Sequence, residues 1–453
     1  MRGEFMIYRK VSLGLAGWIL GGLCLFARAA EPEVLERVFV DEVWAGHRVG
    51  FCLLTAPPFQ FVGYYNAERE MVIARRRLGT QEWERKVLPE RVGWDSHNYI
   101  TMALDRGGCL HISGNMHSGP LVYFRGSAPL EISGLERVPS MVGDRETRCT
   151  YPVFLRGPGD ELIFMYRDGG SGNGDQVFNG YDEADGVWRR MLDTPLTSGE
   201  GAMNAYFHGP VRGPDGYYHL CWVWRDTPDC ETNHDICYAR SRDFASWEDS
   251  AGRKLTLPIT LKTAEIVDPV PAGGGVINGN AKLGFDAEGR VMITYHKYDT
   301  AGNTQVFVAR REGDGWRRYQ VSAWDTRWEF SGRGSIPFLV HVQGAKPVSD
   351  DKVEIGYSHW EKGSGVWVLD GETLALVGSR PPDRRYPRLS REESVPGLQP
   401  NWAGDLGGDD ADGSSGVRYQ LYWATRGVNR DRPQGEPTTS RLEVVGSGLR
   451  PEA

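Results

Sequence analysis

The sequence predicts an all-β protein folded as a single seven-bladed β-propeller. Glycine-rich turns recur along the chain, a strand with alternating apolar and polar residues follows each turn, and about seven such units can be counted. The 453 residues include 58 glycines and 15 tryptophans, a composition that suits tight turns between short aromatic strands. Length alone allows two or three domains, but a radial arrangement explains the repeated units better.

Each unit begins with a turn and a first strand. Turns are predicted at residues 105–108, 158–160, 214–216 and 287–289, and the strands that follow them at residues 109–115, 161–167, 217–225 and 290–297. The seven units are centred near Tyr64, His111, Phe164, Trp222, Thr294, Tyr357 and Tyr422. No amphipathic helix of useful length interrupts them, which favours one domain over several.

An outer strand and a turn that ends on tryptophan close most units. These tryptophans are Trp83, Trp188, Trp247 and Trp316. Residues 241–247 resemble the Asp-box turn of sialidase-type propellers, so Asp243 is expected to bond turn amides while Trp247 packs between blades. Trp222 and Trp224 could stack on a sugar, but the inter-blade core is the favoured interpretation.

The N-terminus has the pattern of a secretory signal peptide. Arg2, Arg9 and Lys10 precede the apolar residues 11–26, and Ala27-Arg28-Ala29 fits a cleavage site. A membrane anchor is the alternative, but 16 apolar residues are short for a span. We therefore predict a signal peptide at 1–29, a secreted or periplasmic protein without stable membrane insertion, a propeller at 30–425, and a partly ordered tail at 426–453 in which a strand helps to close the ring.

Charge and cysteine content restrict the function further. Residues 1–29 carry four basic groups and one acidic group, so their removal changes the net charge from −8 to −11. A protein this acidic is a poor nucleic-acid binder, and a polyanionic sugar could bind only through a local arginine-rich cleft. Six cysteines remain after export, either as disulfides or as buried free thiols. Free thiols are favoured for Cys52 and Cys109.

Four polar residues in otherwise strand-like sequence suggest a reaction. His97 lies in Trp94-Asp95-Ser96-His97-Asn98, His117 follows Gly114-Asn115-Met116, and Tyr151 lies between Thr150 and Pro152. Arg167 precedes a glycine-rich run. Two imidazoles, a phenol and a guanidinium are suited to β-elimination on a uronic acid, in which a base removes the proton beside the carboxylate, an acid protonates the leaving oxygen and a cation stabilises the enolate. No pair of carboxylates typical of glycoside hydrolysis stands out.

The chain resembles a family of propeller enzymes. Residues 45–51, 93–98, 114–117, 166–175, 224–230 and 273–280 are similar to seven-bladed lyases, first described as α-L-rhamnosidases, that cleave rhamnose linked α-1,4 to glucuronate. These lyases are related to propeller ulvan lyases with BNR-type repeats, and the resemblance extends over residues 38–423. It implies that His47 acts as both acid and base. It also implies a second, ulvan-lyase-like site on the opposite face, formed by His97, His117, Tyr151 and Arg167, which could instead be a polar network that closes the channel.

Further residues are weaker candidates. Substrate binding is assigned to His234, Asn278, Asn280, His296 and Arg333. The two asparagines could equally serve a tight turn. His111, His219, His341 and His359 lie in strand patterns and are interpreted as structural. Cys230 and His234 are the weak metal candidates; a structural Ca or Zn is compatible with the sequence, but the proposed chemistry requires no cofactor.

These observations lead to one main functional hypothesis and three alternatives. The expected activity is removal of terminal L-rhamnose from rhamnosyl-α-1,4-D-glucuronate caps of arabinogalactan-type glycans by β-elimination. The alternatives are an endo-acting ulvan-type lyase that uses the opposite face, an α-L-rhamnosidase, and a non-catalytic glycan-binding propeller. In each case the expected partner is a uronate-containing oligosaccharide or polysaccharide.

Overall fold

The computed structural model describes residues 32–349, 351–387, 395–408, 416–435 and 438–448. The predicted signal peptide at 1–29 lies outside these residues. The described chain consists of β-strands and one short 3₁₀ helix, η1 (Cys230–Thr232), so the all-β prediction is confirmed. In the ranges described, no helix is long and apolar enough to cross a membrane.

Seven sheets with antiparallel pairing follow one another along the described chain. The first contains β2 (Cys52–Ala56), β3 (Phe59–Tyr65), β4 (Glu70–Arg77) and β5 (Glu84–Arg91). The second contains β6 (Ile100–Leu104), β7 (Leu110–Gly114), β9 (Tyr123–Arg125) and β10 (Glu136–Arg137). The third contains β8 (His117–Gly119), β11 (Cys149–Arg156), β12 (Leu162–Gly170), β13 (Asn173–Asp182), β14 (Val187–Arg190) and β15 (Thr197–Ser198).

The remaining sheets continue this pattern. The fourth contains β16 (Asn204–Arg212), β17 (Tyr218–Arg225), β18 (Asn233–Ser241), β19 (Trp247–Glu248) and β20 (Glu265–Asp268). The fifth contains β21 (Lys282–Phe285), β22 (Val291–Tyr298), β23 (Thr304–Glu312) and β24 (Gly315–Gln320). The sixth contains β25 (Val340–Val342), β26 (Lys346–Ser349), β27 (Lys352–His359), β28 (Gly363–Asp370) and β29 (Leu376–Arg380). The seventh contains β1 (Glu33–Trp44), β30 (Gln399–Gly404), β31 (Val417–Thr425) and β32 (Thr439–Gly448).

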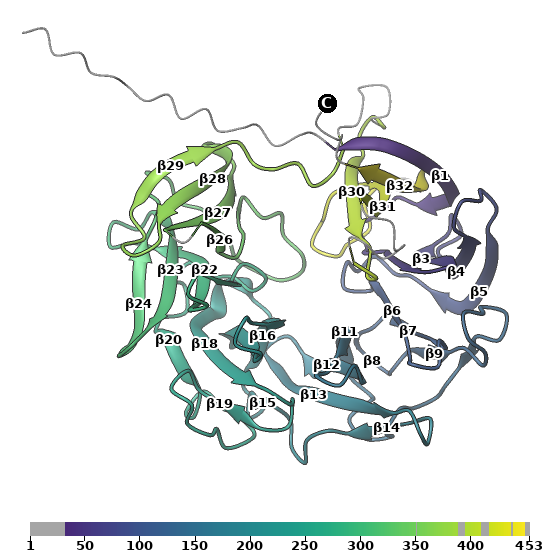
Figure 1. Cartoon of the computed structure of the whole chain (residues 1–453), viewed down its shortest axis with the longest axis horizontal. Coiled ribbons are helices and arrows are strands. Elements are labelled where there is room, and N and C mark those ends of the chain that lie inside the picture. Colours follow the sequence, from purple (N-terminus) through teal and green to yellow (C-terminus); the bar gives the residue numbers. More distant parts are fainter. Residues whose placement is uncertain (1–31, 350, 388–394, 409–415, 436–437, 449–453) are drawn as a thin grey trace, which may run out of the picture.

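The sheets are arranged around a common centre, as Figure 1 shows. Strands such as β11, β16 and β30 lie near the centre, and β5, β14, β24 and β29 lie at the rim (Figure 1). The seven residues predicted as unit centres each fall in a different sheet, on β3, β7, β12, β17, β22, β27 and β31. Because most strands pair with the next strand in the chain, the alternation of apolar and polar residues was sufficient to find these units.

The two ends of the described chain meet in one sheet. Strand β32 pairs with β1 on one side and with β31 on the other, with Val444 opposite both Val38 and Leu421. Leu442, Val444 and Val445 of β32 are buried. The predicted domain boundary at residue 425 is therefore too early, since β32 belongs to the folded ring. The expectation that a strand of the tail helps to close the ring agrees with this pairing.

The predicted Asp-box turn forms as the sequence implies. The Asp243 carboxylate accepts hydrogen bonds from the amides of Ala245, at 2.9 Å, and Ser246, at 2.7 Å. Trp247 is buried and its indole N–H donates to the carbonyl of Phe244 at 3.0 Å. Trp222 and Trp224 are also fully buried, which favours the core interpretation over sugar stacking.

The cysteines of the described residues are free thiols, and all six except Cys109 are buried. Burial raises the pKa of the Cys52 thiol well above its ordinary value, which keeps it protonated and unreactive. The free-thiol alternative therefore applies to all six, and no disulfide contributes to the stability of the described chain.

We expect Leu442→Ala to lower the free energy of unfolding by about 2–5 kcal/mol, because it leaves a cavity in the strand that closes the ring. The neighbouring Arg441, whose side chain is 62% exposed, offers a control on the opposite face of β32: Arg441→Ala should change stability by less than about 0.5 kcal/mol. Urea unfolding followed by tryptophan fluorescence measures both. Equal effects of the two substitutions would contradict the structural role given to β32.

Candidate active site

One carboxylate, that of Asp95, joins two histidines from separate parts of the chain. His97 lies with Asp95 in the connection between β5 and β6, and His117 begins β8. Asp95 Oδ1 is 2.6 Å from His97 Nδ1, and Asp95 Oδ2 is 2.5 Å from His117 Nδ1. The two imidazole rings stack with their centroids 4.0 Å apart. Since both Nδ1 atoms are engaged by the carboxylate, the Nε2 atoms are the ones left for a ligand.

Hydrogen bonding stabilises the ionised form of Asp95. Burial by itself would raise the pKa of this carboxyl, but the hydrogen bonds from His117 and His97 outweigh burial and hold the pKa far below its ordinary value of 3.8. The ionised Asp95 orients both rings through its two oxygens. It thereby acts on them as the aspartate of a catalytic triad acts on its histidine.

Strand pairing places Tyr151 and Arg167 beside His117. Thr150 of β11 lies opposite His117 of β8 on one side and opposite Arg167 of β12 on the other. The register between β11 and β12 then shifts after Thr150, which is a β-bulge. Tyr151 occupies the bulge in the left-handed region, with φ 57°. Bulges redirect side chains, and such a conformation for a bulky residue is a strained feature typical of functional sites.

Two tyrosines and two arginines form the wall beside Tyr151. The guanidinium carbon of Arg167 is 4.9 Å from the ring centroid of Tyr151 and 5.6 Å from that of Tyr206, and Arg225 also lies over Tyr206, at 5.5 Å. Arg167 is only 1% exposed, and its two terminal nitrogens have no hydrogen-bond partner among the described residues. A buried, unneutralised guanidinium is an electrostatic feature suited to stabilising negative charge.

The surroundings shift the pKa values of Tyr151 and Tyr206 in opposite directions. Burial raises the pKa of Tyr151 well above its ordinary value, so this phenol stays protonated. Burial also acts on Tyr206, but the charges of Arg167 and Arg225 outweigh it and lower the pKa of Tyr206. Neighbouring titratable groups whose acidities are driven apart are typical of acid–base sites.

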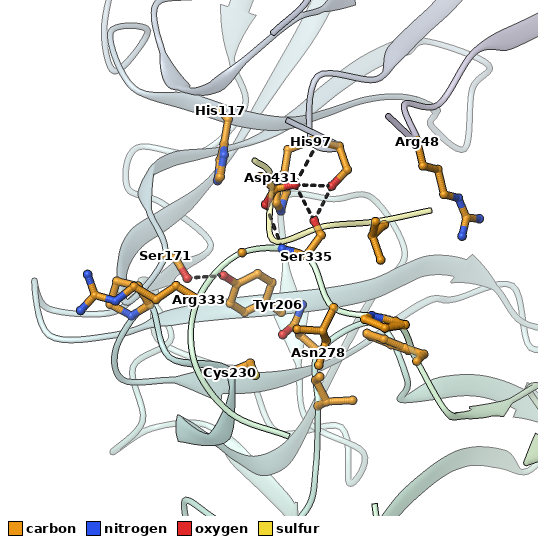
Figure 2. Close-up of a pocket in the computed structure, with 18 of the residues that line it drawn as sticks. Arg48, His97, His117, Ser171, Tyr206, Cys230, Asn278, Arg333, Ser335 and Asp431 are labelled. Carbon is orange, nitrogen blue, oxygen red and sulfur yellow. Dashed lines mark hydrogen bonds and ion pairs between the residues drawn. The ribbon is translucent and has the colours of Figure 1, made fainter. Parts of the chain in front are cut away.

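His97, His117, Tyr151, Tyr206 and Arg225 line a single pocket of about 700 Å³, whereas Asp95 and Arg167 contact these residues from outside the lining. In Figure 2, His97 and His117 lie toward one side, while Tyr206, hydrogen-bonded to Ser171, lies toward the other. Arg48, Arg225 and Arg333 also line the pocket. The chain as a whole is acidic, so this group of arginines is the local basic cleft that the sequence requires for an anionic sugar.

His47 does not form a second site on an opposite face. Its side chain is fully buried, and its Nε2 lies 3.4 Å from Asp431 Oδ1. Asp431 itself lines the pocket, and its other carboxylate oxygen is 3.9 Å from His97 Nδ1. The expectation of two separate faces is therefore wrong, because His47 lies behind the pocket that contains His97. Its neighbour Arg48 is the residue of this motif that reaches the pocket.

The weaker predictions divide into two groups. Asn278 and Arg333 line the pocket. Asn280 does not, because its amide bonds the backbone of Val340 and Val342 and thus serves the fold. His296 is 1% exposed and lies away from the pocket lining, and burial lowers its pKa to about 4. The substrate-binding roles predicted for Asn280 and His296 are therefore corrected to structural ones.

His234 is held by two carboxylates and is not free to bind substrate. Its Nε2 lies 3.0 Å from Asp226 Oδ1 and its Nδ1 lies 2.9 Å from Asp235 Oδ2. Burial opposes the charged form, but the two aspartates outweigh it and raise the pKa of His234. With both nitrogens engaged, His234 cannot also serve Cys230 as a metal ligand, so that metal candidate and the predicted contact with substrate are both corrected.

The group Asp95, His97 and His117 also has the composition of a metal site, with ligand atoms within 4.8 Å of one another. Zinc ligands lie about 2.0–2.1 Å from the ion, which places ligand atoms roughly 3.3 Å apart in a tetrahedron. The separations of 2.5 and 2.6 Å between nitrogen and oxygen are shorter and fit charge-assisted hydrogen bonds. As arranged, these residues do not fit a zinc ion.

Several residues of the site escaped the sequence analysis. Asp95, which bonds both histidines but does not line the pocket, stands two residues before His97, and this spacing was the available signal. Tyr206 lies in a strand with no distinguishing pattern, and Asp431 lies in the segment interpreted as a tail. His341, interpreted as structural, lines the pocket. The position of each depends on neighbours that are distant in sequence.

We expect Asp95→Asn to lower the free energy of unfolding at pH 7 by about 2 kcal/mol, because charged hydrogen bonds to both histidines are weakened. The pKa of Asp95 is lower in the folded state than its ordinary 3.8, so its stabilisation is complete above pH 3.8 and is lost as the pH falls below that value. The difference between wild type and variant should accordingly shrink at pH 3. Urea unfolding at both pH values measures it, with Asp160→Asn as the control, since that side chain is 72% exposed.

Solved structures similar to this chain include two kinds of lyase. The crystal structure of the polysaccharide lyase Uly1 is 14% identical with a TM-score of 0.61, and the alignment covers 92% of this chain and 100% of that one. An ulvan lyase described as a new polysaccharide lyase family is 13% identical with a TM-score of 0.56, covering 87% and 97% of the two chains. The same values hold for that lyase bound to -[GlcA(1-4)Rha3S]-. At these identities the likeness concerns the fold.

Sequence comparison with curated proteins gives no match. A family model described as "BNR repeat-containing family member" matches residues 59–324, which is more than half of the chain. The match begins on β3 and ends after β24, and it includes the strands that carry His117, Tyr151, Arg167 and Tyr206. The chain therefore belongs to the BNR repeat-containing family.

Proposed function

We propose that this protein is a lyase that cleaves uronate-containing glycans by β-elimination on a seven-bladed propeller. The observation that carries the proposal is the arrangement of one pocket, in which two imidazoles on a shared carboxylate face two phenols backed by guanidinium groups. We further propose that its substrate is a glycan ending in L-rhamnose linked α-1,4 to D-glucuronate. The similarity in fold to polysaccharide lyases supports the reaction class.

The histidine pair supplies the base. Because Asp95 accepts from both Nδ1 atoms, each neutral ring keeps its proton on Nδ1 and carries a lone pair on Nε2. His117 Nε2 is assigned to remove the proton from C5 of the uronate, with His97 stacked beside it. Imidazole is suited to this task near neutral pH.

The opposite wall supplies the acid and the positive charge. Tyr151, which burial keeps protonated, is assigned to donate to the departing oxygen. Arg225 lines the pocket and can pair with the uronate carboxylate, while the buried Arg167 behind the two rings stabilises the charge of the enolate. Tyr206 hydrogen-bonds Ser171 at 2.7 Å and completes this wall.

The elimination balances without a further reactant. The C5–H bond breaks as the base takes the proton, its electron pair forms the C4=C5 double bond, and the bond from C4 to the leaving oxygen breaks. Tyr151 donates its proton to that oxygen. The products are free rhamnose and a glycan that ends in an unsaturated uronate, and solvent returns the proton from imidazolium to phenolate.

Simultaneous detection of rhamnose and of the ultraviolet absorbance of the unsaturated uronate tests the proposal. With a rhamnose-capped glucuronate oligosaccharide, we expect His117→Ala and Tyr151→Phe each to lower kcat/KM by about 10²–10⁴-fold. His359→Gln, whose imidazole lies outside the pocket against Trp324, is the matched control and should leave the rate unchanged.

Other outcomes would identify the alternatives. Rhamnose without absorbance would mean hydrolysis and would contradict the lyase mechanism. Activity that survives His117→Ala but disappears in a correctly folded His47→Ala variant would return the chemistry to the histidine behind the pocket. Binding of the oligosaccharide without any product would favour a non-catalytic glycan-binding propeller.

A further inference from the structure

A short segment of chain separates two pockets. Residues 331–335, which we name the strap, lie in the connection between β24 and β25. Arg333, Gly334 and Ser335 line the pocket of the candidate active site. Ser331 lines a second pocket of about 420 Å³, together with Glu231, Tyr298, Arg327 and Arg430. The strap is therefore the wall that the two pockets share.

Asp431 fastens one end of the strap. Its carboxylate accepts hydrogen bonds from the amide of Ser335 at 2.9 Å and from the hydroxyl of Ser335 at 2.8 Å. It also accepts from the amide of Ser96 at 3.2 Å and from its hydroxyl at 3.1 Å. Figure 2 shows these bonds converging on Asp431 beside His97. One carboxylate thus ties the strap to the segment that carries a candidate base.

The other end is fastened to the 3₁₀ helix. The amide of Gly332 donates to Glu231 Oε2 at 2.8 Å, and its carbonyl accepts from the amide of Cys230 at 2.9 Å. Arg333 Nε donates to Asp229 at 3.2 Å. The strap is consequently held at both ends by segments from different parts of the ring, and between them Arg430 Nη1 donates to the carbonyls of Ser331, at 2.6 Å, and Arg333, at 3.1 Å.

The backbone conformation at Asp431 places its carboxylate against the strap. Arg430 and Asp431 both have left-handed conformations, with φ 54° and 56°, which most non-glycine residues avoid and which Asp tolerates better than Arg. Gly334 packs so closely against this turn that a Cβ atom there would lie 2.6 Å from the Arg430 carbonyl oxygen. Strain and close packing at one point indicate that the surrounding contacts enforce the position of the Asp431 carboxylate.

We propose that the strap ends the glycan-binding groove, so that the active-site pocket accepts the end of a chain and excludes its interior. Asp431 is then a positioning residue that sets specificity by holding the strap closed. This inference rests on the proposed lyase activity. If the strap were released, the two pockets would join, and a longer chain could lie across both with the reactive linkage in its interior.

Restriction to chain ends fixes the number of cleavages that each glycan chain can undergo. Once the rhamnose cap leaves, the new chain end is an unsaturated uronate with no leaving group on C4. An enzyme restricted to chain ends can therefore form about one double bond per chain and then stops. An enzyme that accepts internal linkages continues and shortens the chain.

The test uses rhamnose-capped chains of the repeat -[GlcA(1-4)Rha]-, from the trisaccharide Rha-GlcA-Rha to a polymer of known mean length. Final absorbance gives the number of double bonds per chain, and viscosity reports internal cleavage. Wild type is compared with Asp431→Ala and with Glu231→Ala at the opposite end of the strap, which removes the acceptor of the Gly332 amide. Glu329→Ala is the matched control, because Glu329 lines the second pocket and pairs with Arg327 without bonding the strap.

We expect wild type and Glu329→Ala to stop at about one double bond per chain with little loss of viscosity, and both strap variants to exceed that several-fold while viscosity falls. A general structural defect would slow the reaction but would not raise the number of cleavages per chain. Wild type that exceeds one per chain, or folded strap variants that match wild type, would overturn the inference. If Asp431→Ala does not fold, Glu231→Ala decides. Absence of product from the trisaccharide would instead refute the lyase activity itself.

Discussion

The pairing of β32 with both β1 and β31 is the constraint on which the site depends. These strands belong to opposite ends of the described chain, and their hydrogen bonds unite the first and last parts of the ring in one sheet. Residues 426–435, which precede β32, are thereby brought to the pocket, where Asp431 contacts Ser96, Ser335 and the buried His47. A ring that closes in this way places loops from its beginning, middle and end around one pocket, although they are distant in sequence.

Two carboxylates, those of Asp95 and Asp431, lie beside the histidines on one side of the pocket. Asp95 orients both rings through Nδ1, and Asp431 lies slightly farther from His97. Arginine side chains dominate the opposite wall. Arg167 is buried there, and among the described residues no carboxylate forms a hydrogen bond with it. Negative charge is thus placed behind the imidazoles and positive charge behind the phenols. In a desolvated site, such fixed charges act more strongly than in water.

His47 illustrates how a motif can be located correctly while its neighbour is the residue that reaches the pocket. The segment Ala45-Gly46-His47-Arg48 does reach the functional part of the molecule, yet it is Arg48 that lines the pocket while the imidazole of His47 is buried against Asp431. The direction of a side chain at a turn follows from local backbone geometry and from the partner it meets. That partner, Asp431, is 384 residues away in the chain.

Resemblance to a known family pointed to His97, His117 and Tyr151, which line the pocket, and to Arg167, which contacts Tyr151 from outside the lining. The sequence by itself determined the all-β class and the positions of the repeated units. These follow from local rules, since alternation with a period of two marks strands and glycine-rich turns mark their ends. Only the tertiary structure decided that Asp95 serves both histidines, that Tyr206 faces Tyr151, and that Asp431 holds the strap. Asp95 is only two residues from His97, but its contact with His117 and the contacts of Tyr206 and Asp431 join segments that no local pattern couples. These contacts depend on how the sheets are placed around the ring and on the bulge that turns Tyr151 into the pocket.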